Sequence, residues 1–196
     1  MDRNERWKLY YRRTRDERPS ELLIEAVSLV RERGKALDLG AGALRDSKYL
    51  LELGFFVVAV DSCPLVLNEA ASVRHQNLSA IISSFDTYIF PKGAFDLINA
   101  EYSLPFNSPD TFGGMFARVS NSLKEGGVFV GQFFGKNDSW NIPDSNMTFH
   151  SREDVKDALK NFTVIKMIAE EKDEKSTLGK MKHWHIFHVI AQKQKA

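Results

Sequence analysis

Residues 36–47 read ALDLGAGALRDS and join a short apolar run to two glycines and then to a polar segment that can form a helix. Glycine at such a turn lets the backbone approach a ligand closely, and the amide groups that open the next helix favour negative charge. Asp61 ends the next apolar run, 21 residues after Gly40, where an acid can accept hydrogen bonds from two ribose hydroxyls. Together these residues predict a site for a nucleotide-like ligand.

Two ligand classes compete for this pattern. A dinucleotide site uses G-x-G-x-x-G, in which the third glycine allows tight packing around a pyrophosphate. Here Arg45 occupies the third position, and the next glycine is Gly54. S-adenosylmethionine (SAM) has no phosphate, and its amino-acid tail carries an ammonium group that Asp38 would suit. The residues therefore favour SAM.

The elements that would position these residues alternate along the chain. Apolar runs predict strands at 35–39, 55–60, near 79–83, at 95–100 and at 128–134. Helices are expected between them, from the N-cap Ser20 to Gly34, from the glycine turn to Gly54, over 64–74 and over 109–124. Strands that alternate with helices are typical of an open parallel α/β sheet.

The last third of the chain follows a different pattern. Ser151 is expected to cap an amphipathic helix, and two β-rich runs follow at 162–168 and 183–191. The polar stretch between these runs has no helical pattern, and Gly179 can supply a turn. Because a parallel crossover normally needs a helix, the two strands are predicted to be antiparallel neighbours.

The sequence LDLGAG together with Asp61 resembles the nucleotide-binding motifs of class I SAM-dependent methyltransferases. The resemblance implies an α/β, Rossmann-like fold with a seven-stranded, mostly parallel sheet, an antiparallel C-terminal strand and helices on both faces. The stretches LGAGALRDSKYLLELGFFVVAVD, FDLINAEYSLPF, LKEGGVFVGQFFG and KHWHIFHVIAQK are similar to the TehB-type tellurite-resistance branch. The similarity extends from about Pro19 to Lys193 and is interrupted at Leu44, where most members have a third glycine.

The resemblance also implies which residues bind SAM. It assigns the methionine tail to Asp38, Gly40, Ala41 and Gly42, the ribose to Asp61 and Ser62, the adenine to Phe85 and Asp86, and the sulfonium end to Glu101 and Tyr102. Ser84 is an alternative polar partner for the adenine.

The methyl acceptor is expected to be a small molecule. No dedicated base stands out in the sequence, which favours a soft nucleophile such as a thiol, selenium or tellurium species, for which alignment alone suffices. The acceptor-side candidates are Phe106, Gln132, Phe134 and Trp140, with Asn107 and residues 147–150 nearby.

Length and composition set the remaining expectations. The 196 residues, with 43% hydrophobic and 27% charged side chains, predict one methyltransferase domain over 1–196. Its N-terminal arm, residues 1–18, is expected to close over the cofactor through Tyr10 and Tyr11. A net charge of +1 argues against nucleic-acid partners, and no apolar run approaches the roughly 20 residues that span a bilayer. The single cysteine, Cys63, and the polar N-terminus predict a cytoplasmic protein.

A metal site is not predicted from the sequence HWHIFH. In a strand His183 and His185 share one face, whereas His188 points to the other, so this strand alone cannot form a three-histidine site.

Two other functions stay open at this level. One is a protein that binds SAM without catalysis, against which the sequence offers little evidence. The other is a nicotinamide-dependent oxidoreductase on a similar sheet, which Arg45 and the antiparallel C-terminal strands disfavour.

Overall fold

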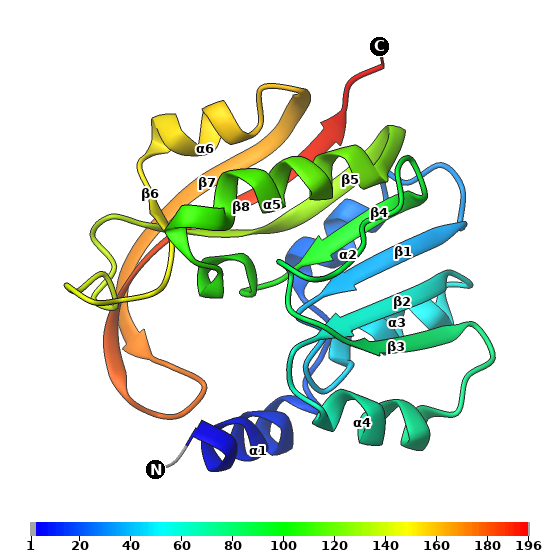
Figure 1. Ribbon diagram of the computed structural model, residues 1–196, viewed down its shortest axis with the longest axis horizontal. Coiled ribbons are helices and arrows are strands. Elements are labelled where there is room, and N and C mark those ends of the chain that lie inside the picture. The colour runs from blue at the N-terminus through cyan, green and yellow to red at the C-terminus, as the bar shows by residue number, and fades with distance from the viewer. Residues whose placement is uncertain (1–2, 196) are drawn as a thin grey trace.

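The computed structural model describes residues 3–195, and its strands form one twisted sheet (Figure 1). The strands are β1 Lys35–Leu39, β2 Phe56–Asp61, β3 Leu78–Ile82, β4 Phe95–Ala100, β5 Leu123–Gly135, β6 Phe149–His150, β7 Phe162–Lys175 and β8 Met181–Lys193. The helices are α1 Arg3–Thr14, α2 Glu21–Val27, α3 Arg45–Glu52, α4 Leu65–Val73, the short 3₁₀ helix η1 Leu104–Phe106, α5 Pro109–Ser122 and α6 Arg152–Ala158.

The strand order is β3-β2-β1-β4-β5-β8-β7, and β6 adds a short pairing to β5. Strands β1 to β5 are parallel, whereas β8 runs antiparallel to both β5 and β7. This confirms the predicted Rossmann-like sheet of seven strands with an antiparallel C-terminal hairpin. The chain leaves β1 toward β2 on one side and β4 toward β5 on the other, so the carboxyl ends of β1 and β4 form the switch point where such sheets bind ligands.

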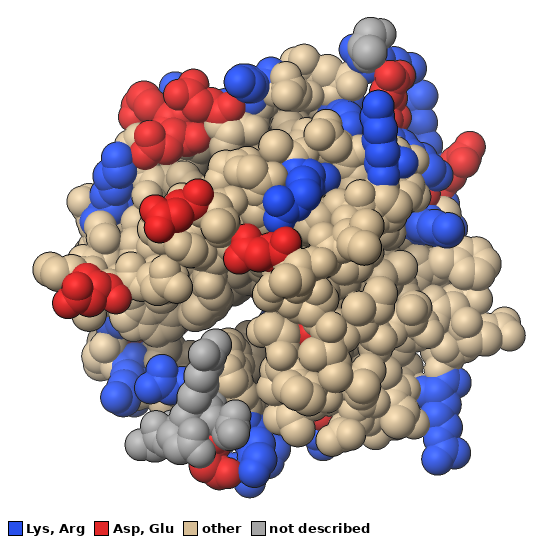
Figure 2. Space-filling model, viewed as in Figure 1, with Lys and Arg blue, Asp and Glu red and all other residues tan. Residues whose placement is uncertain are grey.

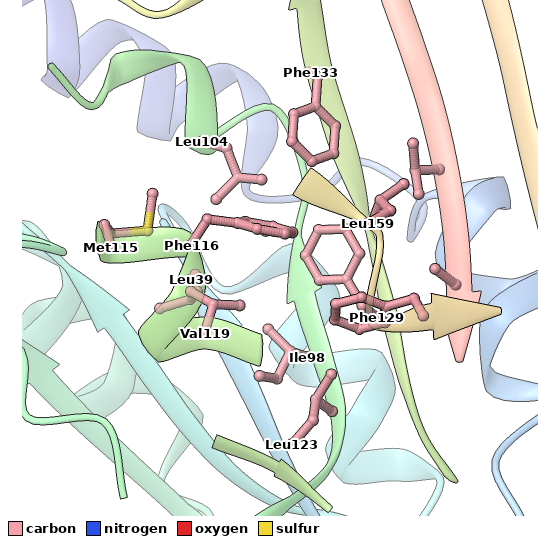
Figure 3. Packing of buried hydrophobic residues seen from close by; sticks show 14 of the residues in the cluster. Leu39, Ile98, Leu104, Met115, Phe116, Val119, Leu123, Phe129, Phe133 and Leu159 are labelled. Carbon is pink, nitrogen blue, oxygen red and sulfur yellow. The ribbon is translucent and has the colours of Figure 1, made fainter. Parts of the chain in front are cut away.

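Helices cover both faces of the sheet, as predicted, and each face has its own apolar core (Figure 1). On one face α5 and α6 bury an aromatic-rich cluster that includes Phe116, Phe129 and Phe133 (Figure 3). On the other face α2 and α3 cover Leu97, Val128 and their neighbours. Side chains alternate between the two faces along each strand, so Asp38 and Gln132, which alternate with residues of the first cluster, face the α2 side.

Several local predictions are confirmed. Ser20 caps α2, with its Oγ 3.5 Å from the N–H of Leu23, and Ser151 forms a capping box with Asp154 at α6. After α3, Gly54 adopts φ +89°, and the N–H groups of Gly54 and Phe55 donate to Leu51 and Leu50. This hydrogen-bond pattern is a Schellman motif, which explains why the helix ends where glycine appears.

The helix predicted up to Gly34 is wrong in its C-terminal part, because α2 ends at Val27. The guanidinium of Arg33 donates to the carbonyl oxygens of Val27 at 3.0 Å and Val30 at 2.9 Å. These bonds satisfy carbonyl groups that a longer helix would have used, so they stabilise the early end.

The polar connector predicted between the last two strands is also wrong, since β7 continues to Lys175 and β8 begins at Met181. Polar side chains contact one another across the hairpin, as in the 3.1 Å hydrogen bond between His188 and Glu170. Such cross-strand pairs stabilise a two-stranded ribbon. Only the turn near Gly179, at φ +84°, remains outside the strands.

Candidate active site

The turn after β1 is held in a left-handed backbone conformation at three positions. Gly40, Gly42 and Leu44 have φ of +74°, +50° and +62°. A Cβ built on Gly40 would lie 2.3 Å from the Cβ of Ser103, so only glycine fits where the loop after β4 approaches this turn. Glycine is required here both by the torsion and by the close approach.

Asp61 at the end of β2 is tied to this turn. Its Oδ2 accepts from the N–H of Gly42 at 2.8 Å, and its Oδ1 accepts from the N–H of Cys63 at 2.7 Å. Burial raises the pKa of the carboxyl group, and the two N–H bonds oppose that shift. Each oxygen keeps a further lone pair that can accept another donor.

Asp38 is 2% exposed and belongs to a polar network behind the turn. Its oxygens accept from the Ser47 hydroxyl at 2.5 Å and the Asn99 amide at 2.9 Å. Burial, together with the nearby charge of Asp46, raises the Asp38 pKa to about 7. Arg45 binds Asp46 through two nitrogens, at 3.0 and 2.8 Å, which fixes the first turn of α3 against the network.

Glu101 follows β4 on the other side of the switch point. Its Oε2 accepts from Gln132 Nε2 at 2.7 Å, and Gln132 Oε1 in turn accepts from the N–H of Tyr102 at 2.8 Å. Its Oε1 is buried and has no hydrogen-bond partner within residues 3–195. Burial is the main cause that raises the Glu101 pKa to about 7, so this carboxyl group can exchange a proton near neutral pH.

Aromatic rings from five segments form a continuous cluster beside Glu101, here called the aromatic wall. Its members are Trp7, Tyr102, Phe106, Phe134, Trp140 and Trp184. Neighbouring ring centroids lie 5.6 to 6.4 Å apart, as in the pairs Trp140–Trp184 and Tyr102–Phe134. Phe106 remains 48% exposed, so the wall presents part of its apolar surface to solvent. Figure 2 shows the molecule hollowed beside the β7–β8 side, with mostly uncharged side chains around the opening.

A buried ion pair supports the aromatic wall. Lys182 forms a salt bridge with Asp138, and both side chains are almost fully buried. The Lys182 ammonium group lies 3.8 Å from the ring centre of Trp140 and 4.1 Å from that of Trp184, both within cation–π range. Asp138 also accepts from the N–H of Trp140 at 3.0 Å. The pair therefore anchors the loop that carries Trp140.

Helix α1 lies against the glycine turn. A Cβ on Gly42 would be 3.7 Å from the ring of Tyr10, and the hydroxyl of Tyr11 is buried without a hydrogen-bond partner in the described residues. The charge of Asp61 contributes to a raised Tyr11 pKa, behind burial as the main cause. Arg15, just after α1, binds Glu69 of α4, with 2.9 Å between Nε and Oε2.

Comparison with known proteins identifies the kind of domain. Residues 36–127, which contain the glycine turn, Asp61 and Glu101, match a family model described as a methyltransferase domain. This segment of the chain is a methyltransferase domain. No curated protein matches the sequence.

Solved structures share the fold of this methyltransferase at low sequence identity. TehB from Haemophilus influenzae is 18% identical with a TM-score of 0.72, and the match covers 88% of this chain and 61% of TehB. A 1,6-didemethyltoxoflavin-N1-methyltransferase from Burkholderia thailandensis, solved with S-adenosylhomocysteine (SAH), is 19% identical with a TM-score of 0.63, covering 89% and 79%. The N-methyltransferase NodS from Bradyrhizobium japonicum, also solved with SAH, is 13% identical with a TM-score of 0.68, covering 92% and 90%. TehB is thus one of several distant neighbours, and the predicted TehB-type branch stays a prediction.

The predicted cofactor residues gather around the switch point. Phe85 places its ring 3.6 Å from a Cβ on Gly40, while Ser62 and Asp86 are exposed at the rim. The predicted acceptor residues separate into two groups. Phe106, Phe134 and Trp140 belong to the aromatic wall, whereas Gln132 is buried and orients Glu101.

Other predicted acceptor residues lie elsewhere. His150 packs against Phe112 and Phe133 in the core on the α5 side, and burial lowers its pKa to about 4. Asn107 is buried, and its carbonyl accepts from the Thr148 hydroxyl at 2.7 Å.

Sequence reasoning missed several residues of the site. The sequence prediction did not include Trp184 and Lys182, although alternation along the strand places both on the α2 face with His188. Asn99 had a visible signal, since it is a polar residue inside the otherwise apolar end of β4. Asp138 gave none, because its loop has no periodic pattern.

Within the described part of the chain, every helix is too short or too polar to span a bilayer.

Proposed function

We propose that this methyltransferase holds SAM across the β1–β4 switch point and transfers its methyl group to a small molecule bound on the α2 face. The roles proposed for the chain follow the sequence prediction: Asp38, Gly40, Ala41 and Gly42 at the methionine tail, Asp61 and Ser62 at the ribose, Phe85 and Asp86 at the adenine, and Glu101 and Tyr102 at the sulfonium end. When bound, SAM supplies an electrophilic methyl group on a positively charged sulfur.

One observation carries this proposal, namely that two backbone N–H groups, one of them in the glycine turn after β1, hold the Asp61 carboxylate beside that turn. Two buried hydroxyl groups beside the glycine turn also fit an adenosyl-amino-acid ligand. The Tyr11 hydroxyl lies near Asp61 and Cys63, and the Ser103 hydroxyl lies near Gly40. Buried polar atoms normally have partners, so these two hydroxyl groups support a ligand at the turn.

The arm of residues 1–18 is proposed to be a lid, with residues 1 and 2 outside the described part of the chain. The contacts of Tyr10 with the glycine turn and of Arg15 with Glu69 support this role. A closed lid would exclude water from the reacting centre, which strengthens electrostatic interactions there. The remaining residues up to 196 would form the same domain.

The acceptor class predicted from the sequence was a soft nucleophile, on the ground that no base was apparent. Glu101 is a carboxyl group poised near neutral pH, and it supports an acceptor that loses a proton, such as a nitrogen or oxygen nucleophile. The two structural neighbours whose printed names include N-methyl transfer are consistent with a nitrogen acceptor. A thiol or tellurium acceptor remains the alternative.

The test is a turnover assay with methyl-labelled SAM and a panel of amines, phenols, thiols, selenite and tellurite. The proposal predicts label transfer to at least one small molecule and SAH as the co-product. SAH binding without transfer to any compound would instead favour a protein that binds SAM without catalysis.

A further inference from the structure

A groove of about 890 Å³ lies between α2 and the β7–β8 hairpin, on the face of the sheet that carries Gln132. Its inner end is formed by Glu101, Tyr102 and Gln132, at the carboxyl end of β4 and in β5. The hairpin curls past the edge of the sheet toward α1 (Figure 1), where Arg13 donates to the carbonyl of Thr177 at 2.6 Å. Because Glu101 and Tyr102 are also the residues proposed at the sulfonium end of SAM, the groove adjoins the proposed cofactor site.

The groove is strongly acidic. Five of its lining side chains are glutamates, against one lysine and one histidine: Glu21, Glu25, Glu101, Glu170 and Glu171. Along the outer part, Lys166 binds Glu25, and Lys172 lies 3.1 Å from Glu170, so opposite charges compensate there.

At the inner end the negative charge is not compensated in the same way. Arg45, whose charge acts on Glu101, is paired with Asp46 at 2.8 Å and with Glu17 at 3.5 Å. Gln132 is neutral and occupies only one oxygen of Glu101. The other oxygen is buried near the Ser20 hydroxyl but makes no hydrogen bond of good geometry within residues 3–195, so it can accept from a ligand donor.

Tyr102 borders the inner end with an aromatic ring. Its backbone is held at φ +50°, which is rare for a residue other than glycine. Its ring centroid lies 6.5 Å from His188 and 6.2 Å from Trp184. An unpaired carboxylate beside an aromatic face is the combination that recognises organic cations, because both attract positive charge.

From this arrangement we infer that the groove binds the methyl acceptor and that the acceptor is a small organic cation with a primary or secondary amine. The inference rests on the proposed function and adds the substrate class. The ammonium form donates to Glu101 Oε1 and gives up one proton to it, which leaves a neutral amine and a neutral carboxylic acid. The nitrogen lone pair then forms the new N–C bond while the C–S bond breaks and its electron pair stays on sulfur. The products are the methylated ammonium ion and SAH, and Glu101 returns its proton to water.

The first test compares three ring compounds of similar size that differ in charge, benzylamine, benzyl alcohol and benzoate, each at millimolar concentration with the SAH-bound protein. A ligand that binds the native state raises the melting temperature. Benzylamine is expected to raise it, and the alcohol and benzoate are not. An equal shift with the alcohol or benzoate, or no shift with benzylamine, overturns the inference.

The second test uses a substitution at the inner end of the groove, beside the end of β5 that carries Gln132. Glu101→Gln should abolish the benzylamine shift and should lower the rate of amine methylation at least a hundredfold. In Glu101→Gln the dissociation constant for SAH should change less than threefold, because SAH lacks the sulfonium charge. Glu125→Gln, an exposed acid at the opposite end of β5, is the matched control and should change neither readout.

The outcomes separate the two proposals. Absence of SAH binding by the unmodified protein contradicts the proposed function itself. Normal SAH binding with methylation of thiols or phenols but not amines contradicts only the amine inference. A large loss of SAH binding in Glu101→Gln would show that Glu101 holds the cofactor tail. That result also overturns the amine inference.

Discussion

At the scale of single residues, Leu44 shows how a departure from a family pattern can be accommodated. It adopts φ +62°, the conformation that favours glycine, yet its side chain is fully buried beside Ala41, Ala59 and Val66. A left-handed conformation costs a residue with a Cβ about 1–2 kcal/mol, whereas full burial of a leucine side chain contributes about 1.5–3 kcal/mol. The packing of Leu44 therefore compensates for its backbone strain.

This balance predicts an unusual order of stability. Leu44→Ala keeps the strain and loses the packing, so we expect it to lower the free energy of unfolding by about 2–4 kcal/mol. Leu44→Gly loses the same packing but relieves the strain, and it should be about 1 kcal/mol more stable than the alanine variant. Urea unfolding of the three proteins measures both differences. An alanine variant more stable than the glycine variant would contradict this explanation of the turn.

Glu101 links stability to pH. Its folded-state pKa of about 7 exceeds the value of about 4.3 in an unfolded chain. Between these values the folded state keeps a proton that the unfolded state releases, so this carboxyl group lowers stability as pH rises from about 4 to about 7. The charged groups that act on it are Asp46 and Arg45 of α3, while β5 contributes the neutral Gln132.

Glu101→Gln removes this titration. We expect the variant to match the unmodified protein near pH 4 and to exceed its stability by up to about 3 kcal/mol at pH 8. Asp38, whose pKa is raised to about 7 as well, leaves a residual slope of the same sign in both proteins. Urea unfolding at several pH values measures the difference. Parallel pH profiles of stability for the two proteins would mean that burial does not raise the pKa of Glu101.

At the scale of elements, α1 is a terminal helix attached to the rest of the molecule along one face, with Trp7 against Phe106 and Tyr11 buried. Arg15, just beyond its end, binds Glu69, and the Lys48 ammonium group donates to the carbonyl of Arg15 at 2.6 Å. Terminal elements open more easily than the core. We therefore expect amide hydrogen exchange in α1 to be fast without ligand and slower by tenfold or more with SAH.

Helix α5 provides the internal control for this measurement. Its apolar side is buried in the core, with Phe112, Met115 and Phe116 at most 5% exposed, so its exchange should not depend on SAH. Equal exchange in α1 with and without SAH would contradict the role of residues 1–18 as a lid.

The loop that carries Trp140 depends on the buried pair of Asp138 and Lys182. Removing one partner of a buried ion pair leaves an uncompensated charge, which typically costs about 3–5 kcal/mol. We expect Asp138→Asn and Lys182→Met each to lower stability by about this amount. The double variant should lose clearly less than the sum of the two, and a double-mutant cycle by chemical denaturation measures the coupling. Additive losses would mean that the two side chains act independently.

At the scale of the whole molecule, the sheet could be predicted from sequence because its central strands are short apolar runs with clear boundaries. Buried parallel strands must be apolar on both sides, so β1, β2 and β4 appear as continuous runs that end at a glycine or an acid. The antiparallel hairpin also followed from the sequence, since the connector had no helical pattern. These features fixed the switch point, and with it the neighbourhood of Asp61 and Glu101.

Other parts could not be predicted, because tertiary contacts determine them. Residues 3–14 carry only a short aromatic stripe, Trp7, Tyr10 and Tyr11, among charged residues, and α1 is placed by contacts such as that between Tyr10 and the glycine turn. The charged residues of β7 resemble a loop until they pair across the hairpin with β8. The proton-accepting role proposed for Glu101 depends on its burial and on Gln132, which lies 31 positions away in the sequence.

The central claim is that Asp61 and the glycine turn form a SAM site, and a calorimetric titration with SAH tests it most directly. Asp61→Asn keeps the size of the side chain but removes its charge, which should weaken SAH binding by about 1.5–3 kcal/mol, or roughly 10- to 150-fold. The account predicts that the unmodified protein binds SAH, that Asp61→Asn binds it more weakly by this factor while remaining folded, and that a nicotinamide dinucleotide does not bind. Unchanged SAH affinity in folded Asp61→Asn, or preferred binding of the dinucleotide, would contradict it.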